Sequence, residues 1–214
     1  MTEYQIPGRV PDDSTPRDAV SNYWRERYTA EPYYDDQLFF EDYEPAYRIG
    51  HAARAQDMIR AYEQVEAELE SRWASERGRS RLEWAQARGA VRRGWDQTQW
   101  LEAEHIAPGA THPGAKGVID EHLSGLGLQR HIVARCPHFS LIPGMVASTL
   151  LVLTTGRQYC ERFVDTLPVT IMPCPVQFPR MMYYQLWHAR THTSASNKWL
   201  RERIKSVAAE LRKE

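Results

Sequence analysis

Two unlike halves of the chain meet at Ala107-Pro-Gly-Ala-Thr-His-Pro-Gly-Ala-Lys-Gly117, a stretch rich in proline and glycine and typical of a linker or loop. Residues 1–105 hold 14 Arg, no Lys and 21 Asp and Glu, a net charge of −7. Residues 106–214 hold 13 basic and 7 acidic residues, a net charge of +6. The sequence therefore predicts an acidic first domain over 17–105, a linker over 106–117 and a second domain over 118–214.

The bulk composition predicts a soluble globular protein. Of the 214 residues, 42% are hydrophobic and 26% are charged, and the net charge of −1 predicts no strong attraction to nucleic acid or membrane. Residues 1–16 are polar and broken by proline, so we expect a disordered start without a secretory signal. The longest mostly apolar run, Leu141 to Leu153, is too short to span a bilayer. We therefore expect a cytoplasmic protein without a membrane partner, and buried, reduced thiols at its three cysteines, Cys136, Cys160 and Cys174.

Hydrophobic periodicity predicts that the first half is mostly helical. A short helix is expected over 17–28, and the aromatic, acidic stretch 31–50 has no regular period, which predicts an extended, ordered loop. One helix face is formed by Met58, Tyr62, Val65, Leu69 and Trp73 and ends at Gly78; the next, after a capping box at Ser80 and Glu83, is formed by Trp84, Ala87, Val91, Trp95 and Thr98. The two faces predict a helical hairpin joined near residues 75–79.

The first half also resembles a small bacterial protein family of unknown function, suspected of stress-related roles. The resemblance rests on Glu41-Asp-Tyr-Glu-Pro-Ala-Tyr-Arg48 and on the later run from Glu66 through Arg77-Gly78 to Trp95. It implies no catalytic residue. Arg88, Arg92 and Arg93 form a short basic strip that could contact phosphate, although the acidic surroundings favour a solvated helix face.

Strand and helix patterns alternate in the second half, which predicts an α/β layer with a mostly parallel sheet. Expected strands are 131–136, 150–155, 169–172 and 181–187. Expected helices are 118–126, closed by Gly127, then 143–148, 157–165 and a clear amphipathic helix over 197–211. That last helix has one apolar face, formed by Trp199, Leu200, Ile204, Val207, Ala208 and Leu211.

Residues from about 111 to 211 contain a series of motifs: Gly117-Val-Ile-Asp120, Arg130-His-Ile-Val133, Cys136-Pro-His-Phe139, Pro143-Gly-Met-Val-Ala-Ser148, Ile171-Met-Pro173 and Leu186-Trp-His188 with Trp199-Leu-Arg201. In content and order these motifs resemble the C-terminal part of the effector-binding domain of LysR-type transcriptional regulators. The resemblance implies a partial type 2 periplasmic-binding-protein-like subdomain. Together with the N-terminal helical hairpin and aromatic loop expected from periodicity, it predicts an α+β chain.

The resemblance also implies a ligand site. The family binds small effectors, often organic or aromatic acids, and open α/β sheets bind ligands at the carboxyl ends of their strands. The residues expected to contact such an effector are Pro137, His138, Phe139 and Ser140 after one strand, with Thr154 and Thr155 after the next. The alternative is that Pro137 and Phe139 belong to the core and that His138 lies in a surface loop.

The departures from the family suggest other partners. Residues 1–105 show no helix-turn-helix, so no specific DNA binding is expected. The strand 181–187 would lack its usual sheet, which predicts self-association, pairing with an intact LysR-type regulator, or docking of the N-terminal hairpin over that edge.

No catalytic group, metal site or cofactor is expected. His188 and His192 lack a third ligand, and Cys136 and His138 are too close in sequence for the imidazole to activate the thiol. The sequence thus predicts a non-enzymatic sensing or interaction protein. The alternatives are a stress-associated protein whose role lies in the helical half, and a fusion of two gene fragments without a joint function.

Overall fold

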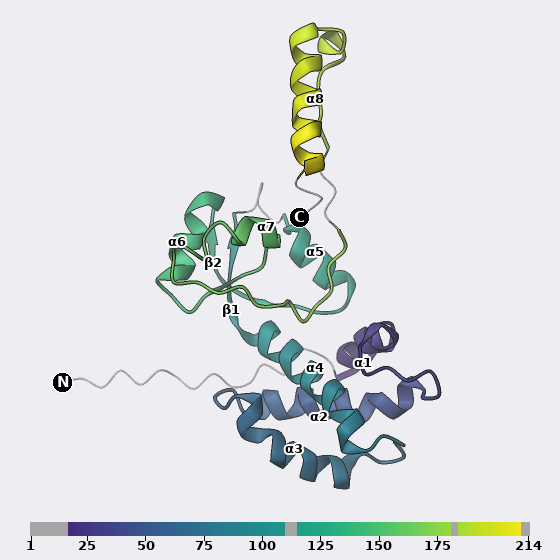
Figure 1. The fold of residues 1–214 in the computed structure, drawn as a ribbon. Helices are drawn as coiled ribbons and strands as arrows, with labels where there is room; N and C mark the ends of the chain where they lie inside the picture. The colour runs from purple at the N-terminus through teal and green to yellow at the C-terminus, as the bar shows by residue number, and fades with distance from the viewer. Residues whose placement is uncertain (1–16, 110–114, 181–183, 211–214) are drawn as a thin grey trace, which may run out of the picture. The chain divides into compact units, whose positions relative to one another are not determined.

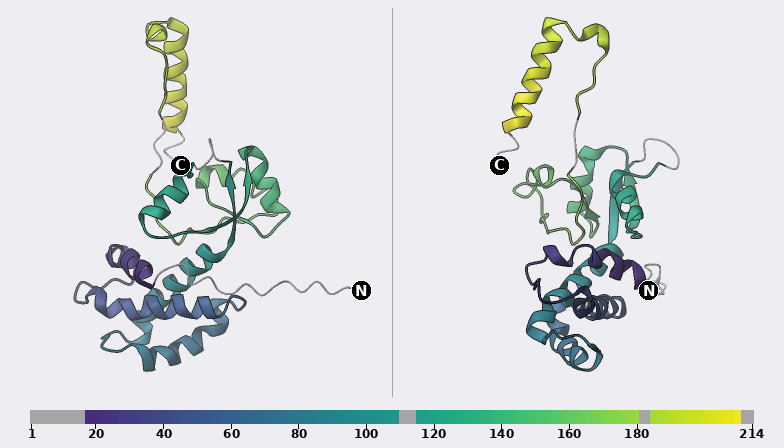
Figure 2. Two further views of the ribbon diagram at one scale, coloured as in Figure 1. Left: turned by 180° about the vertical axis from the view of Figure 1, so that it is seen from behind. Right: turned by 90° about the vertical axis from the view of Figure 1, so that its right-hand side faces the viewer.

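The computed structural model describes residues 17–109, 115–180 and 184–210, so the predicted disordered start, 1–16, lies outside the described residues. The chain forms two compact units, one ending at Phe178 and the other beginning at Pro179 (Figures 1 and 2). The first unit contains α1 (Arg17–Arg25), η1 (Tyr28–Ala30), α2 (Phe40–Gln56), α3 (Tyr62–Glu76), α4 (Trp84–Glu102), β1 (Glu104–Pro108), α5 (Val118–Gly125), β2 (His131–Cys136), η2 (Phe139–Leu141), α6 (Ile142–Ala147), β3 (Val152–Leu153) and α7 (Arg157–Cys160). The second contains η3 (Ala189–Thr191) and α8 (Ala195–Glu210).

Helices α2 and α4 cross with their backbones in direct contact. A Cβ atom on Gly50 of α2 would overlap the carbonyl oxygen of Val91 on α4, and a Cβ on Gly94 of α4 would overlap the carbonyl oxygen of Tyr47 on α2. Glycine is the one residue type that allows both approaches without moving a backbone. The crossing brings Trp24, Tyr47 and Trp95, all at most 1% exposed, into one aromatic core.

The predicted hairpin of α3 and α4 is confirmed, but its boundaries differ. Gly78 has a left-handed φ of 59° just after α3, as its predicted role in ending the helix requires. Met58 lies outside α3 and is 42% exposed, so it does not belong to the buried face. Ser80 does not cap α4: its hydroxyl donates to the carbonyl oxygen of Asp42 at 2.6 Å, and α4 begins three residues later than the capping-box pattern predicted.

The prediction of a loop over 31–50 is wrong for its second part. The chain is a loop as far as Phe39, but α2 begins at Phe40 and contains Pro45. A proline in the second turn of a helix removes a single backbone hydrogen bond, whereas Phe40, Tyr43 and Tyr47 recur at helical spacing and are at most 4% exposed. Their burial outweighs the lost bond.

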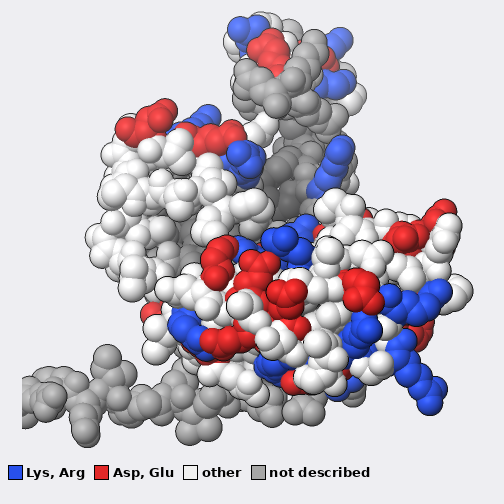
Figure 3. Space-filling model, turned by 60° about the horizontal axis from the view of Figure 1, so that its bottom comes forward, with Lys and Arg blue, Asp and Glu red and all other residues white. Residues whose placement is uncertain are grey.

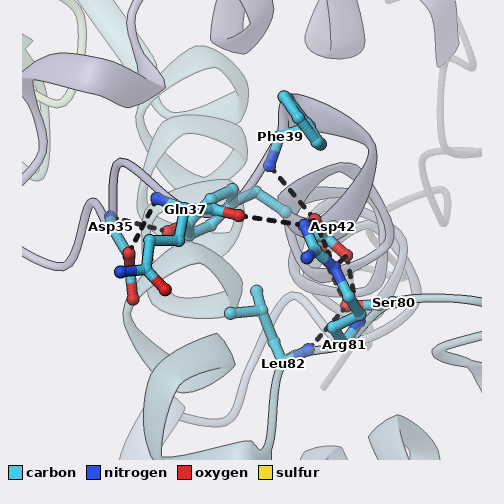
Figure 4. A network of polar contacts seen from close by, with 8 residues as sticks. Asp35, Gln37, Phe39, Asp42, Ser80, Arg81 and Leu82 are labelled. Atoms are coloured by element: carbon cyan, nitrogen blue, oxygen red, sulfur yellow. Dashed lines mark hydrogen bonds and ion pairs between the residues drawn. The ribbon is translucent and has the colours of Figure 1, made fainter.

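A carboxylate ties the start of α2 to the loop before α4 (Figure 4). The Asp42 side chain accepts hydrogen bonds from the Arg81 backbone N–H at 3.0 Å, from the Arg81 guanidinium at 2.7 Å and from the Phe39 backbone N–H at 3.1 Å. These bonds, the Arg81 side chain first, lower the pKa of Asp42 to about 2. The Arg81 guanidinium also donates to the carbonyl oxygen of Gln37, so one arginine holds two turns of the chain in place.

The sheet of the second half is parallel, as predicted, but its central strand comes from an unexpected place. The strand order is β2-β1-β3, and β1, Glu104–Pro108, overlaps the region predicted to be a linker from residue 106. Ile106 and Ala107 are at most 1% exposed there. The polar, glycine-rich residues 110–114 that suggested a linker lie outside the described residues. The change of composition near residue 105 therefore coincides with the first strand of the sheet and not with a linker.

Several other expectations for the second half need correction. Strand β2 and helices α5 and α6 fall close to their predicted ranges, and Gly127 has the expected left-handed φ, 68°. Strand β3 contains only two residues, and α7 ends at Cys160 instead of residue 165. Residues 169–172 form no strand; the prolines that flank them have no backbone N–H to donate to a neighbouring strand. The described part of 181–187, residues 184–187, is not a strand either.

A buried polar cluster lies where α4 passes into β1. His105 is fully buried, and its Nε2 donates to the carbonyl oxygen of Trp100 at 2.7 Å, while its Nδ1 has no hydrogen-bond partner. Arg130 is also buried and donates from Nε to Asp120 at 2.7 Å. Burial first, and then the nearby Arg130, lower the pKa of His105, so the ring is held neutral.

The helix α8 is confirmed, but its predicted apolar face is not buried. No residue of α8 is buried, and Trp199, Leu200, Ile204 and Val207 are between 44% and 68% exposed. Among the helices of the described residues, none is both long and apolar enough to cross a bilayer.

We predict that Asp42→Asn lowers the free energy of unfolding by about 2 kcal/mol at neutral pH, the range expected for hydrogen bonds to a charged group. The folded-state pKa of Asp42 is depressed, so its contribution is present above the unfolded pKa and is lost as the pH falls from about 4 towards 2. Urea unfolding of the wild-type chain should show this loss, and the variant should lack it. Asp36→Asn, in an exposed loop, should leave the curve unchanged; an equal loss in that control would contradict the assignment.

We predict that His105 makes stability fall on mild acidification. Because its folded-state pKa is lowered, its contribution is complete above the unfolded pKa of about 6.5 and decreases as the pH falls below that value, by at most about 1.4 kcal/mol per pH unit. His105→Gln should flatten the dependence of unfolding free energy on pH between about 6.5 and 5. The matched control is His138→Gln, at an exposed position; a flattened curve in the control instead would refute the role of His105.

Candidate functional site

The six residues predicted to contact a ligand lie along one edge of the parallel sheet. Pro137 to Ser140 follow the end of β2, and Thr154 and Thr155 follow the end of β3. Both strands run parallel to β1, so their carboxyl ends meet at the same edge. The structure therefore brings the two predicted segments to a common edge, on either side of the central strand.

Backbone contacts fix the path of the chain after β2. The Gly109 N–H, next to β1, donates to the carbonyl oxygen of Cys136 at 2.8 Å. A Cβ on Gly109 would lie 2.9 Å from the Cα of Pro137, so a larger residue would push the two strand ends apart. The Cys136 thiol donates to the backbone oxygen of His138 at 3.3 Å, so this hydrogen bond does not involve the His138 imidazole ring.

Tyr159 joins the two segments and was not predicted. Its ring lies 4.6 Å from that of Phe139, and its hydroxyl donates to the backbone oxygen of Phe139 at 3.1 Å. Burial raises the pKa of Tyr159, which keeps the hydroxyl protonated as a donor. The sequence offered one hint: Tyr159 lies in the helix predicted from Arg157, just after the strand predicted to end at Thr155.

The side chains at this edge differ in exposure. Pro137, His138 and Ser140 are exposed, whereas Phe139 and the two threonines are half-buried. The hydroxyl of Thr154 is itself buried and has no hydrogen-bond partner. A buried hydroxyl without a partner is costly, so a ligand atom or a water that reached it would be stabilised. The edge thus offers aromatic surface, an imidazole and hydroxyl groups, the chemistry that binds an uncharged ring and a polar substituent.

Two hollows lie in the helical half. One, of about 530 Å³, lies along α2 and the end of α3 and is lined by Arg48, His51, Arg72 and Arg79 among others. The other, of about 580 Å³, is a shallow hollow lined by Pro32 to Asp36 and Gln86. Neither includes a predicted ligand residue. Neither hollow therefore coincides with the candidate site.

The described residues contain no cluster of three or more His, Cys, Asp or Glu side chains placed to hold a metal ion. The cysteines are unpaired, but the expectation that all three are buried is wrong: Cys136 is buried, Cys160 is half-buried and Cys174 is exposed. Cys174 follows Pro173 in an irregular segment that no helix or strand covers, which explains its exposure.

The chain is similar to several bacterial transcription regulators. It is 29% identical over 97 residues to the HTH-type transcriptional activator NahR of Pseudomonas putida, and 30% identical over 104 residues to the HTH-type transcriptional activator NagR of a Ralstonia species. It is also 23% identical over 111 residues to nodulation protein D 2 of Rhizobium tropici. These relatives are LysR-type regulators, which supports the predicted relationship to that group.

The similarity covers part of each protein. The matched residues are 45% and 49% of this chain, and the chain spans about a third of the length of NahR and NagR, 31% and 34%. No family model matches the chain, and no solved structure matches it. The similarity therefore establishes a relationship to LysR-type regulators for about half of the chain.

Proposed function

We propose that this chain is a non-enzymatic, cytoplasmic ligand-sensing or interaction protein related to LysR-type regulators. The observation that carries the proposal is the similarity to NahR and NagR over about half of the chain, together with a parallel sheet whose strand ends carry the residues expected at an effector site. The ligand would be a small organic or aromatic acid. Its ring would stack on Phe139, and a polar group would reach the unpartnered hydroxyl of Thr154.

A second candidate function places the role in the helical half. That half supplies most of an extensive aromatic core, in which Trp24 stacks on Tyr47 at 4.5 Å and donates from Nε1 to Gln97 at 3.0 Å. A well-packed acidic helical domain could act as an interaction module independently of the sheet. This candidate corresponds to the resemblance of the first half to a stress-associated bacterial family. In the other alternative, a fusion of two gene fragments, neither half would bind a ligand.

We further propose that the chain does not read DNA sequence directly. Each arginine of the basic strip on α4 pairs with a carboxylate: Arg88 with Glu66 at 3.1 Å, Arg92 with Glu63 and Asp96, and Arg93 with Glu31 at 2.8 Å. Figure 3 shows acidic and basic side chains interspersed over the helical half. Phosphate binding relies on basic groups that are free to replace counterions, and these guanidinium groups are already neutralised. Regulation would then pass through self-association or through pairing with an intact LysR-type regulator.

The ligand proposal predicts a thermal shift of the full chain with one class of organic or aromatic acid. A ligand at about 100 times its dissociation constant should add roughly 2.7 kcal/mol to the unfolding free energy. Thr154→Val removes the hydroxyl at nearly constant volume and should weaken binding about tenfold, the loss of one hydrogen bond to a buried group. Thr166→Val, at an exposed position, is the matched control. If no acid in the panel shifts the melting temperature, the ligand-sensing proposal is wrong and an interaction role of the helical half is favoured.

The DNA proposal predicts that the full chain selects no preferred sequence from a pool of random duplexes. Weak, salt-sensitive retention without sequence preference would be compatible with the pairing of the α4 arginines. Enrichment of one sequence, retained at physiological salt and lost in Arg92→Ala, would contradict the proposal. Arg157→Ala is the control for a change of net charge, since Arg157 pairs with Glu161 just after α7.

A further inference from the structure

The helix α8 carries an apolar stripe that no part of its own unit covers. Leu200, Ile204 and Val207 follow one another at spacings of four and three, the pattern of a helix seam, and are 49%, 47% and 44% exposed. None of residues 184–210 is buried. The unit that begins at Pro179 therefore lacks a core among its described residues.

The segment before α8 widens this apolar surface. It lies beside the helix (Figures 1 and 2) and is held there by Arg201, which lies 4.5 Å above the Trp187 ring and donates to the backbone oxygen of His192 at 2.8 Å. Gln185 donates to the backbone oxygen of Arg201 at 3.2 Å. These contacts leave Trp187 46% exposed and Leu186 93% exposed.

Such a unit is not stable by itself. A helix of 16 residues without a packed face is marginal in water, and large exposed apolar patches mark surfaces that bind a partner. The contacts of Arg201 order the unit but bury no apolar core. The stripe therefore requires a cover.

We propose that the cover is a second copy of this chain, with the two α8 helices paired antiparallel. In this arrangement Ile204 of each copy packs against Val207 of the other, so one patch serves both sides of a two-fold axis. Complete burial of the stripe, Trp187 and Leu186 would remove on the order of 600 Å² per copy from water, close to the roughly 1,200 Å² in total of a stable interface.

The charges of α8 favour the antiparallel direction. Residues 195–205 carry Lys198, Arg201, Arg203 and Lys205 against Glu202, whereas the last turn carries Glu210. Arg203 and Glu210 are seven residues apart and share one flank of the stripe, so antiparallel pairing places Arg203 of one copy beside Glu210 of the other. Opposed helix dipoles also favour this direction over the parallel one. The pairing gives a surface to the self-association proposed above, and it can fail without affecting the ligand test.

The experiment is sedimentation equilibrium of the full chain over a wide range of concentration. We expect a monomer–dimer equilibrium whose dissociation constant rises at least about tenfold in Ile204→Glu, which buries a carboxylate in the seam. Ala209→Glu introduces the same charge on the opposite face of α8 and should change the dissociation constant of the dimer less than about twofold. Arg203→Glu and Glu210→Arg should each weaken the dimer, and the double variant should restore it.

Three results would overturn the proposal. The first is a monomer at every concentration. In that case, α8 amides protected from hydrogen exchange would show that the same chain covers the stripe, and freely exchanging amides would show that nothing covers it. The second is a dimer that Ile204→Glu leaves unchanged. The third is a double charge reversal that is no better than either single variant, which would exclude the antiparallel register. Far-UV circular dichroism of each variant establishes that the remainder of the fold is intact.

Discussion

The contact between the backbones of α2 and α4 is the constraint on which the helical half depends. Gly50 and Gly94 each face a carbonyl oxygen on the opposite helix, so the two helices can approach only because both positions lack a Cβ. That close approach leaves little volume between the helix axes and sends the large side chains to the flanks. There Trp24 stacks on Tyr47, and Tyr33 and Tyr47 share a hydrogen bond of 2.9 Å between their hydroxyls. A methyl group at either glycine would separate these rings as well as the helices.

The flanking aromatic residues need polar partners, and the chain supplies them from distant segments. Trp24 reaches Gln97 on α4, Trp73 donates to the backbone oxygen of Leu82, and Tyr62 donates to the backbone oxygen of Arg88. Burial raises the pKa of Tyr47 and Tyr33, so both hydroxyls remain protonated, and one of them donates its hydrogen to the other. Aromatic side chains with one polar end thus join α1, α2, α3 and α4 around the crossing of α2 and α4.

Sequence periodicity predicted those elements that bury a regular face and failed where another constraint decides the structure. The buried faces of α3 and α4, the strand β2 and the helix α8 follow from spacing alone. Helix α2 is hard to predict because Pro45 lies within it. The role of Gly50 in its packing depends on contact with α4, which the sequence pattern does not show. Strand β1 was missed because it is five residues long and adjoins a glycine-rich stretch. The candidate ligand residues implied by the family resemblance do lie at one edge of the sheet, in agreement with the rule for parallel sheets. Tyr159 could not be predicted, because its contact with Phe139 spans 20 residues and follows from no motif.

The position of β1 also bears on whether the two halves form one protein. Strand β1 begins two residues after α4 ends, and it is the central strand of a sheet whose other strands come from the second half. In the other direction, Val176 and Leu123 pack into the aromatic core of the helical half, and the Gln177 N–H donates to the Tyr23 hydroxyl at 3.0 Å. A boundary at residue 105 would therefore divide a strand and expose part of both cores. This shared packing argues against two independent fragments and for a joint fold up to Phe178, whereas the apolar stripe of α8 stays exposed within its own unit.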